Sequence, residues 1–138
     1  MAEFTNYLEN KLLDHVLNNA SFTSPTTVYV GLFTAAPTDT TSGTEVTGGS
    51  YARQVLAVST ASEGVVTSDA DINFPQATAN WGTVVALGIH DALSSGNLLM
   101  YTDLTTSNRS QAIPAYVFGF DIKFELKSQR LVQPSHSE

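Results

Sequence analysis

The side chains best suited to acid–base or metal chemistry lie far apart in this 138-residue sequence. Histidine, the usual proton carrier near neutral pH, occurs three times, at His15, His90 and His136, and no pair has the short spacing of a local metal-binding motif. Asp69 and Asp71 could offer oxygens to calcium, but the glycine and the distal glutamate of a calcium-binding loop do not follow them. We therefore expect no metal ion and no cofactor.

Covalent catalysis finds equally little support. The chain has no cysteine, no serine stands in a G-x-S-x-G elbow, and the glycines match neither the P-loop nor the dinucleotide fingerprint. Asp91 and Asp103 flank a predicted hairpin and could act as a carboxylate pair, although acidic residues at hairpin ends are common. The sequence predicts a protein that is not an enzyme.

Two groups of residues could instead contact other molecules. Trp81, the single tryptophan, could stack on a sugar together with Tyr51, or it could close one end of a β-sandwich. Lys123, Lys127 and Arg130 are half of the six basic residues and lie near the carboxyl end of an acidic chain. This end could dock on an acidic neighbour, or it could be a solvated arm.

The element nearest the amino terminus is predicted to be a helix over about residues 6–19. Asn6, with Glu9 three residues later, predicts the N-cap. The apolar stripe must be covered by the sheet of its own chain or by a neighbouring subunit. Its members recur at three- and four-residue spacing: Leu8, Leu12, Leu13, Val16, Leu17 and Ala20.

The residue pattern of the rest of the chain is typical of β-strands joined by polar loops and turns. A long polar loop at residues 35–50 is of the kind that function or a partner usually holds in place. We predict a mainly β fold, an antiparallel β-sandwich or small barrel with one N-terminal helix and a C-terminal arm. Residues 1–126 would form a single domain and residues 127–138 the arm. Strands are expected at residues 27–34, 53–60, 71–74, 83–92, 98–103 and, by strict alternation, 116–126.

Composition limits the choice of partners. A formal net charge of −7 argues against nucleic acid, and no apolar run is long enough for a membrane helix. The first residues lack the pattern of a secretory signal, so we expect a soluble protein made in the cytosol. The 17 threonines and 14 serines far outnumber the basic residues, so the polar surface is built from hydroxyls rather than charges. Such a surface suits a protein that meets other subunits, although threonine is also simply a good strand residue.

Several of these segments, taken together, resemble a family of small structural proteins of tailed bacteriophages that are often labelled tail fibre proteins. The similarity runs from about Asn6 to Thr106, and its most specific parts are GGSYARQ at 48–54 and the block from Phe74 to Thr83. Members tend to have an aromatic residue where His90 stands and to end soon after the alternating strand, whereas here a basic and polar tail follows. The resemblance implies no catalytic or cofactor residues. The segments are NYLENKLLDHVL, SPTTVYVGLFTAAPTD, GTEVTGGSYARQ, INFPQATANWGTVVALGIHDA and GNLLMYTDLTT.

The resemblance implies a structural protein of the virion, made in the cytoplasm of a bacterial host. Our main expectation is a capsid decoration, or cement, protein on the capsid surface, which binds the major capsid protein as a homo-oligomer, a trimer, and stabilises the head. The alternative is a tail or head fibre or adaptor component that recognises the host surface. Neither nucleic acid nor a membrane is expected as a partner. The candidate interface residues are Leu8, Leu12, Tyr51, Arg53, Trp81, Lys127, Arg130 and Leu131.

Overall fold

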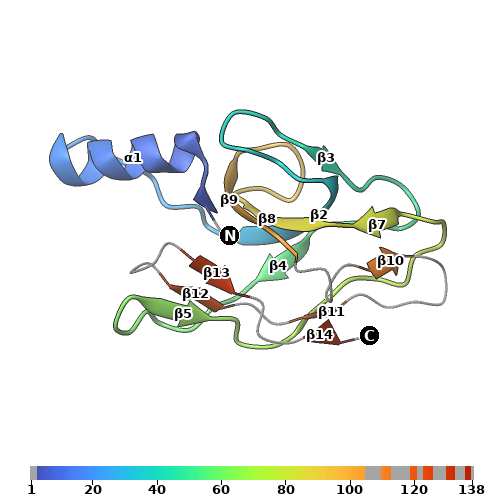
Figure 1. The fold of residues 1–138 in the computed structure, drawn as a ribbon. Coiled ribbons are helices and arrows are strands. Elements are labelled where there is room, and N and C mark those ends of the chain that lie inside the picture. The colour runs from blue at the N-terminus through green and yellow to red at the C-terminus, as the bar shows by residue number, and fades with distance from the viewer. Residues whose placement is uncertain are drawn as a thin grey trace.

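The protein is mainly β, with one helix at its amino-terminal end (Figure 1). The computed structural model describes residues 3–104, 110–112, 119–120, 123–125, 130–132 and 136–137. The helix α1 spans Asn6–Leu17. The predicted fold class is thereby confirmed. The strands are β1 Glu3–Phe4, β2 Val28–Ala35, β3 Thr44–Glu45, β4 Gln54–Leu56, β5 Val65–Thr67, β6 Ile72–Asn73, β7 Gly82–Val84, β8 Ala86–His90, β9 Leu98–Asp103, β10 Ser110–Ala112, β11 Gly119–Phe120, β12 Lys123–Glu125, β13 Arg130–Val132 and β14 His136–Ser137.

Six antiparallel strands form the main sheet. Its order is β1-β9-β8-β2-β3, and β4 also pairs with β2. The outer edge of β2 is therefore shared, since β4 pairs with its first half at Val28–Val30 and β3 pairs with its second half from Phe33. Strand β8 lies between β2 and β9 and all five of its residues are buried, so it forms the middle of the fold.

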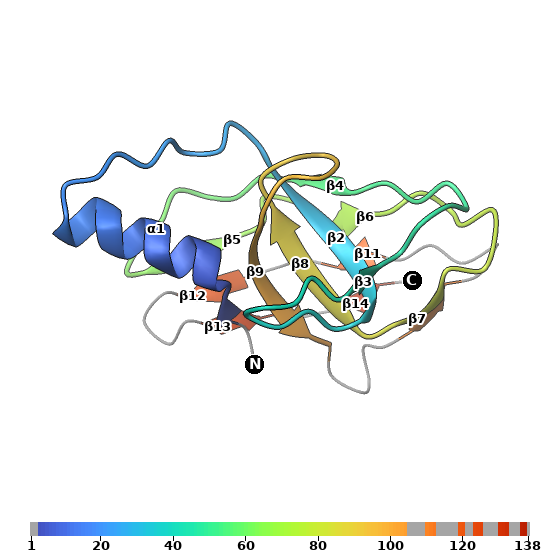
Figure 2. The same ribbon diagram turned by 90° about the horizontal axis from the view of Figure 1, so that it is seen from above.

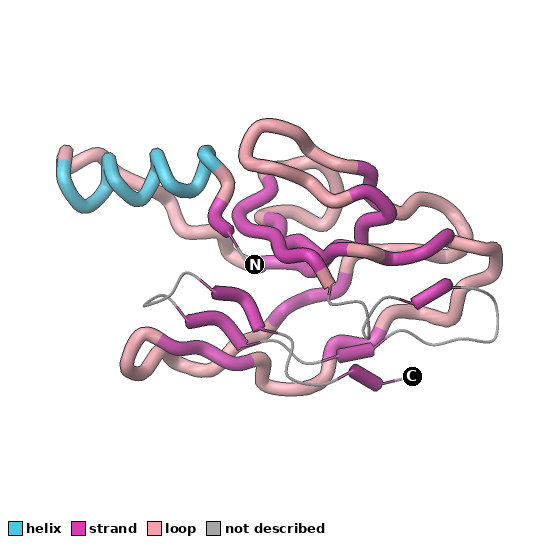
Figure 3. Tube along the Cα trace, viewed as in Figure 1, coloured by secondary structure: helices cyan, strands magenta, loops and turns pink. Residues whose placement is uncertain are grey.

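The core lies on one face of this sheet. Val30 is paired with Ile89 and Leu32 with Leu87, so these four side chains share a face, and each is at most 4% exposed. A second layer of short strands covers this face, because Phe124 of β12 packs on the same core and stacks on the Phe4 ring at 5.4 Å. Figure 3 shows how strands and connecting loops make up this body, with the helix to one side.

Two strand predictions and one loop prediction differ from the structure. The strand predicted at residues 53–60 is paired only as Gln54–Leu56. The strand predicted at residues 83–92 divides at Val85, where the chain leaves β7 and joins the main sheet as β8. The loop predicted at residues 35–50 contains a short strand, β3, that pairs back onto β2. In each case long-range pairing, which local residue patterns do not encode, sets the bounds.

The carboxyl end contributes short strands to the second layer. The described parts of the alternating segment 116–126 are β11, which pairs with β6, and β12, which pairs with β5. The described parts of the predicted arm are β13, which pairs with β12, and β14, which pairs with β11. The division between a body at residues 1–126 and an arm at residues 127–138 stays a prediction.

The N-cap of the helix lies one residue earlier than the sequence suggested. Thr5, not Asn6, is the N-cap, and its hydroxyl accepts the N–H of Leu8 at 3.4 Å. The prediction was wrong because a hydroxyl one position earlier fills the cap and makes Asn6 the first helical residue. The helix ends at Leu17, shortly before Asn19 adopts a left-handed conformation with φ of 57°.

Candidate interface and the polar network beside it

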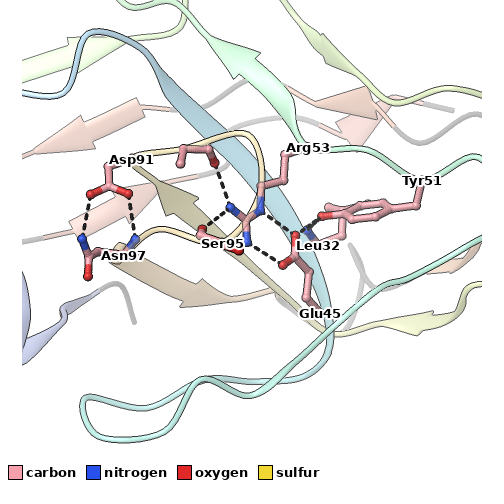
Figure 4. Close-up of polar contacts among 8 residues, drawn as sticks. Leu32, Glu45, Tyr51, Arg53, Asp91, Ser95 and Asn97 are labelled. Carbon is pink, nitrogen blue, oxygen red and sulfur yellow. Dashed lines mark hydrogen bonds and ion pairs between the residues drawn. The ribbon is translucent and has the colours of Figure 1, made fainter.

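A tyrosine fills the gap on the shared edge of β2. Because β4 ends its pairing at Val30 and β3 begins at Phe33, the outward N–H of Leu32 has no strand partner there. The Tyr51 hydroxyl accepts this N–H at 3.0 Å and donates its own proton to Glu45 Oε2 at 2.6 Å (Figure 4). One phenol thus joins β2 to β3.

Arg53 extends this chain of hydrogen bonds to the hairpin between β8 and β9. Its Nε donates to Glu45 Oε2 and its Nη2 to Glu45 Oε1, both at 2.8 Å. Its Nη1 donates to the carbonyl oxygens of Ala92 and Ser95, also at 2.8 Å (Figure 4). The Arg53 side chain is only 9% exposed, so it anchors the surrounding loops instead of projecting into solvent. The long loop that contains Glu45 is therefore held by its own chain.

The network converges over a glycine in the middle of β2. A Cβ atom at Gly31 would lie 2.9 Å from Glu45 Oε2, 3.0 Å from His90 Cε1 and 3.1 Å from the Tyr51 hydroxyl. Contacts this short are not tolerated by rigid, hydrogen-bonded groups. Only glycine at this position lets the carboxylate, the phenol and the imidazole approach the strand together.

Burial and charge fix the protonation states of these groups. Burial raises the pKa of Glu45, but hydrogen bonds from Arg53 and Tyr51 outweigh this effect and hold it below its ordinary value. Burial, with the hydrogen bond to Glu45, raises the pKa of Tyr51. Burial, with the positive charge of Arg53, lowers the pKa of His90 to about 4. None of these four groups changes charge near neutral pH, so the network is suited to holding loops in place and not to proton transfer.

His90 is a neutral ring at the edge of this network. Its side chain is 4% exposed and stacks on the Phe33 ring at 5.8 Å. Among the described residues, its Nδ1 has no hydrogen-bond partner. His90 therefore acts chiefly as a flat packing group.

A left-handed turn places Tyr51 and is itself fixed by the tryptophan. Gly48, Gly49 and Ser50 all have positive φ, between 57° and 73°. Trp81 Nε1 donates to the Gly49 carbonyl oxygen at 2.8 Å, and the indole packs edge-on against the Tyr51 ring at 5.5 Å. Trp81 is only 6% exposed. It closes the core, as one of the two interpretations predicted, and offers no exposed face for a sugar.

Of the two acidic residues that could have formed a carboxylate pair, Asp91 has a structural role. Asp91 accepts the N–H of Asn97 at 2.7 Å and its side-chain amide at 3.0 Å, which closes the hairpin (Figure 4). Asp103 lies at the end of β9, opposite Ala86. Within the described ranges, no cluster of three or more histidine and acidic residues could hold a metal ion. No helix among the same residues is long and apolar enough to cross a membrane.

The apolar stripe of α1 is covered only at its start. Leu8 is buried and Leu12 is half-buried, whereas Leu13, Val16 and Leu17 are 55%, 72% and 73% exposed. Figure 2 shows the helix extending beyond the edge of the sheet. We call Leu13, Val16 and Leu17 the helix ridge. The chain's own sheet thus covers the first turns of the stripe and leaves the ridge open.

The predicted interface residues are distributed over the fold as follows. Leu8 and Trp81 are interior, and Tyr51 and Arg53 belong to the polar network. Lys127 lies outside the described residues. Two of the predicted residues, Arg130 and Leu131, are in β13, whose backbone pairs with β12. Their part in an interface stays a prediction.

Two features were missed in the sequence. Glu45 received no role, although it is the one acidic residue between Asp39 and Glu63 and so the natural partner for Arg53. The ridge was seen as part of an apolar stripe, but its exposure could not be read from periodicity. Periodicity shows that apolar side chains share a face, and it does not show what covers them.

Comparison with known proteins places the chain in a family. A family model described as "Podophage GP4 fiber I protein gp80" matches residues 3–118 of the 138, which include the helix, the main sheet and the turn before Tyr51. The chain belongs to this family. No curated protein matches it.

Membership in the podophage fiber I family confirms the predicted resemblance to phage structural proteins. The chain is a structural component of the virion and, as the sequence predicted, not an enzyme. Of the two functions expected from the sequence, the fibre component is better supported by the family than the capsid cement protein.

Proposed function

We propose that this protein is a fibre component of a podophage virion, attached at the tail or head, that takes part in recognising the host surface. The observation that carries the proposal is the match to the podophage fiber I family over residues 3–118. This match favours a fibre over our first expectation, a cement protein on the capsid lattice. The function is one of binding and not of turnover.

The fold is consistent with a rigid module that presents loops. The Arg53 guanidinium fixes the hairpin at Ala92 and Ser95, and Trp81 fixes the turn at Gly49. Loops held by buried hydrogen bonds lose little conformational entropy when they bind, which favours recognition. These 138 residues contain no repeats that could build a shaft, so we assign them to a tip, an adaptor or one part of a larger fibre.

Copy number per virion tests the proposal directly. Quantitative mass spectrometry of purified particles, scaled to the major capsid protein, should give a few to a few dozen copies if the protein belongs to a fibre at a tail or a unique vertex. Lattice decoration follows the symmetry of the shell and would give on the order of hundreds of copies. Such a number would overturn the fibre proposal.

Host recognition needs a separate measurement. The purified protein should compete with virions for adsorption to host cells, and the competition should be saturable. A low copy number without any competition would leave the protein as a fibre component and remove its part in recognition.

A further inference from the structure

The chain carries an apolar groove that complements its own helix ridge. A cavity of about 150 Å³ lies between the main sheet and the β5–β12 ladder, and all of the side chains that line it are apolar. Val58, at 39% exposure, reaches the surface there. We call this cavity the β4–β5 groove. Its walls include Val28, Leu56, Val58, Val66, Met100 and Phe124.

The groove has room for a side chain of the ridge. An apolar cavity of about 150 Å³ stays dry and accepts a benzene-sized molecule. A leucine side chain has four carbons and is smaller than benzene, which has six. Leu17, at 73% exposure, is the most exposed member of the ridge and would fit such a space.

The helix of the same chain cannot fill this groove. Its start is tied to β9, because the Thr5 N–H donates to Leu99 O at 2.9 Å and the Thr5 hydroxyl donates to Leu98 O at 2.7 Å. Leu8, one turn later, is 7% exposed and packs in the core. These contacts fix the start of the helix, whose far end extends beyond the edge of the sheet (Figure 2), and moving the ridge into the groove would break them. Within the part of the chain that the structure describes, the helix is therefore no occupant of the groove, and a second copy can supply the ridge instead.

Charge does not oppose the approach of a second copy at these two surfaces. The chain has a formal net charge of −7, so most pairs of surfaces would repel. Residues 54–62, which form one rim of the groove, contain no charged side chain. The helix carries Glu9, Lys11 and Asp14, which nearly balance. Contact between ridge and groove therefore gains apolar burial with little repulsion.

We propose that the helix ridge of one copy docks in the β4–β5 groove of a second copy. The two surfaces are different patches of the same chain, so the contact is heterologous and must either close into a ring or continue as a chain of subunits. A closed ring of three would agree with the trimer expected from the sequence. The proposal concerns self-association and does not depend on where the protein attaches to the virion.

Three matched lysine variants of the full chain test the proposal. Leu17→Lys removes the ridge, and a cation in the last turn suits the helix. Val58→Lys blocks the groove. Leu93→Lys changes another exposed leucine, with an exposure of 57% that lies between those of Val58 and Leu17, on the hairpin beyond the Arg53 network. Circular dichroism and thermal unfolding show first that each variant is folded.

Sedimentation equilibrium from about 1 µM to about 1 mM should then show a mass above the 14.8 kDa monomer for the wild type and for Leu93→Lys. Leu17→Lys and Val58→Lys should each associate at least about tenfold more weakly, since each removes a buried apolar side chain from the contact. Mixed together, these two variants should form a dimer and nothing larger, because one intact ridge meets one intact groove.

Two outcomes would overturn the proposal. A wild type that remains at monomer mass over the whole concentration range would exclude self-association through these surfaces. Loss of association in Leu17→Lys with full association in Val58→Lys would show that the ridge pairs with another surface, such as a second ridge.

Discussion

Replacing Arg53 with methionine should lower the free energy of unfolding by about 3 kcal/mol at pH 7. The variant keeps an aliphatic stem but leaves the Glu45 carboxylate without its two charged hydrogen bonds. Removing one partner of a buried ion pair costs about 3–5 kcal/mol. The lower end applies here because the side chains are 9% and 22% exposed, so some water reaches Glu45. The carbonyl oxygens of Ala92 and Ser95 would also lose their donor.

Urea unfolding followed by tryptophan fluorescence measures this loss. Trp81 is the single tryptophan and is buried beside Tyr51, so its emission reports the state of the network and of the core together. With a slope of about 1.5 kcal/mol per molar urea, a loss of about 3 kcal/mol moves the midpoint by about 2 M.

The pH dependence of the effect identifies its cause. In the wild type the folded pKa of Glu45 lies below its ordinary 4.5, so its contribution to stability is present above pH 4.5 and is lost as the pH falls through the folded value. Without Arg53 the effect of burial dominates and the pKa of Glu45 rises. The folded variant then binds a proton more readily, and its deficit should be smaller at pH 4 than at pH 7.

Two controls test the reasoning. The double variant Arg53→Met with Glu45→Gln should lose less than the sum of the two single changes, because the residues form one unit. Lys11→Met changes an exposed cation near the Tyr7 ring and should alter stability by no more than about 0.5 kcal/mol. An Arg53→Met loss within that same range, unchanged between pH 4 and pH 7, would refute a buried ion pair.

Three further predictions follow from the same structure. The pKa of His90 is about 4 in the folded protein and 6.5 ordinarily, so the unfolded chain takes up the proton first as the pH falls. The free energy of unfolding should therefore fall between pH 6.5 and about 4, by up to about 3 kcal/mol. His90→Phe should remove this pH dependence, as measured by unfolding titrations. Thr5→Val should cost about 1–2 kcal/mol in thermal unfolding through loss of the cap, whereas the exposed Thr23→Val should be nearly neutral. Gly49→Ala should destabilise more than Gly48→Ala, by at least about 2 kcal/mol, because both have positive φ but only the new methyl at 49 would lie 2.7 Å from the indole nitrogen; equal losses would contradict the packing of that turn.

The sequence alone determined the features that depend on local periodicity. The three- and four-residue spacing from Leu8 to Leu17 predicted α1, and the β-branched and aromatic runs predicted β2 and β9 nearly to the residue. The segments around Tyr51 and Trp81 pointed to a family of phage structural proteins, and the family match agrees. These features are local because each is fixed by which side chains share one face of one element.

Only the tertiary structure decided what covers each face and which polar groups meet. Glu45 and Arg53 lie eight residues apart in a segment without periodicity, and the gap that Tyr51 fills exists only because two different strands share the edge of β2. The exposure of the helix ridge likewise could not be read from the sequence, because periodicity does not show what covers a face. The chemical type of a side chain sets its preference for burial. The contacts that satisfy this preference come from segments brought together by folding or, as we propose for the ridge, by assembly.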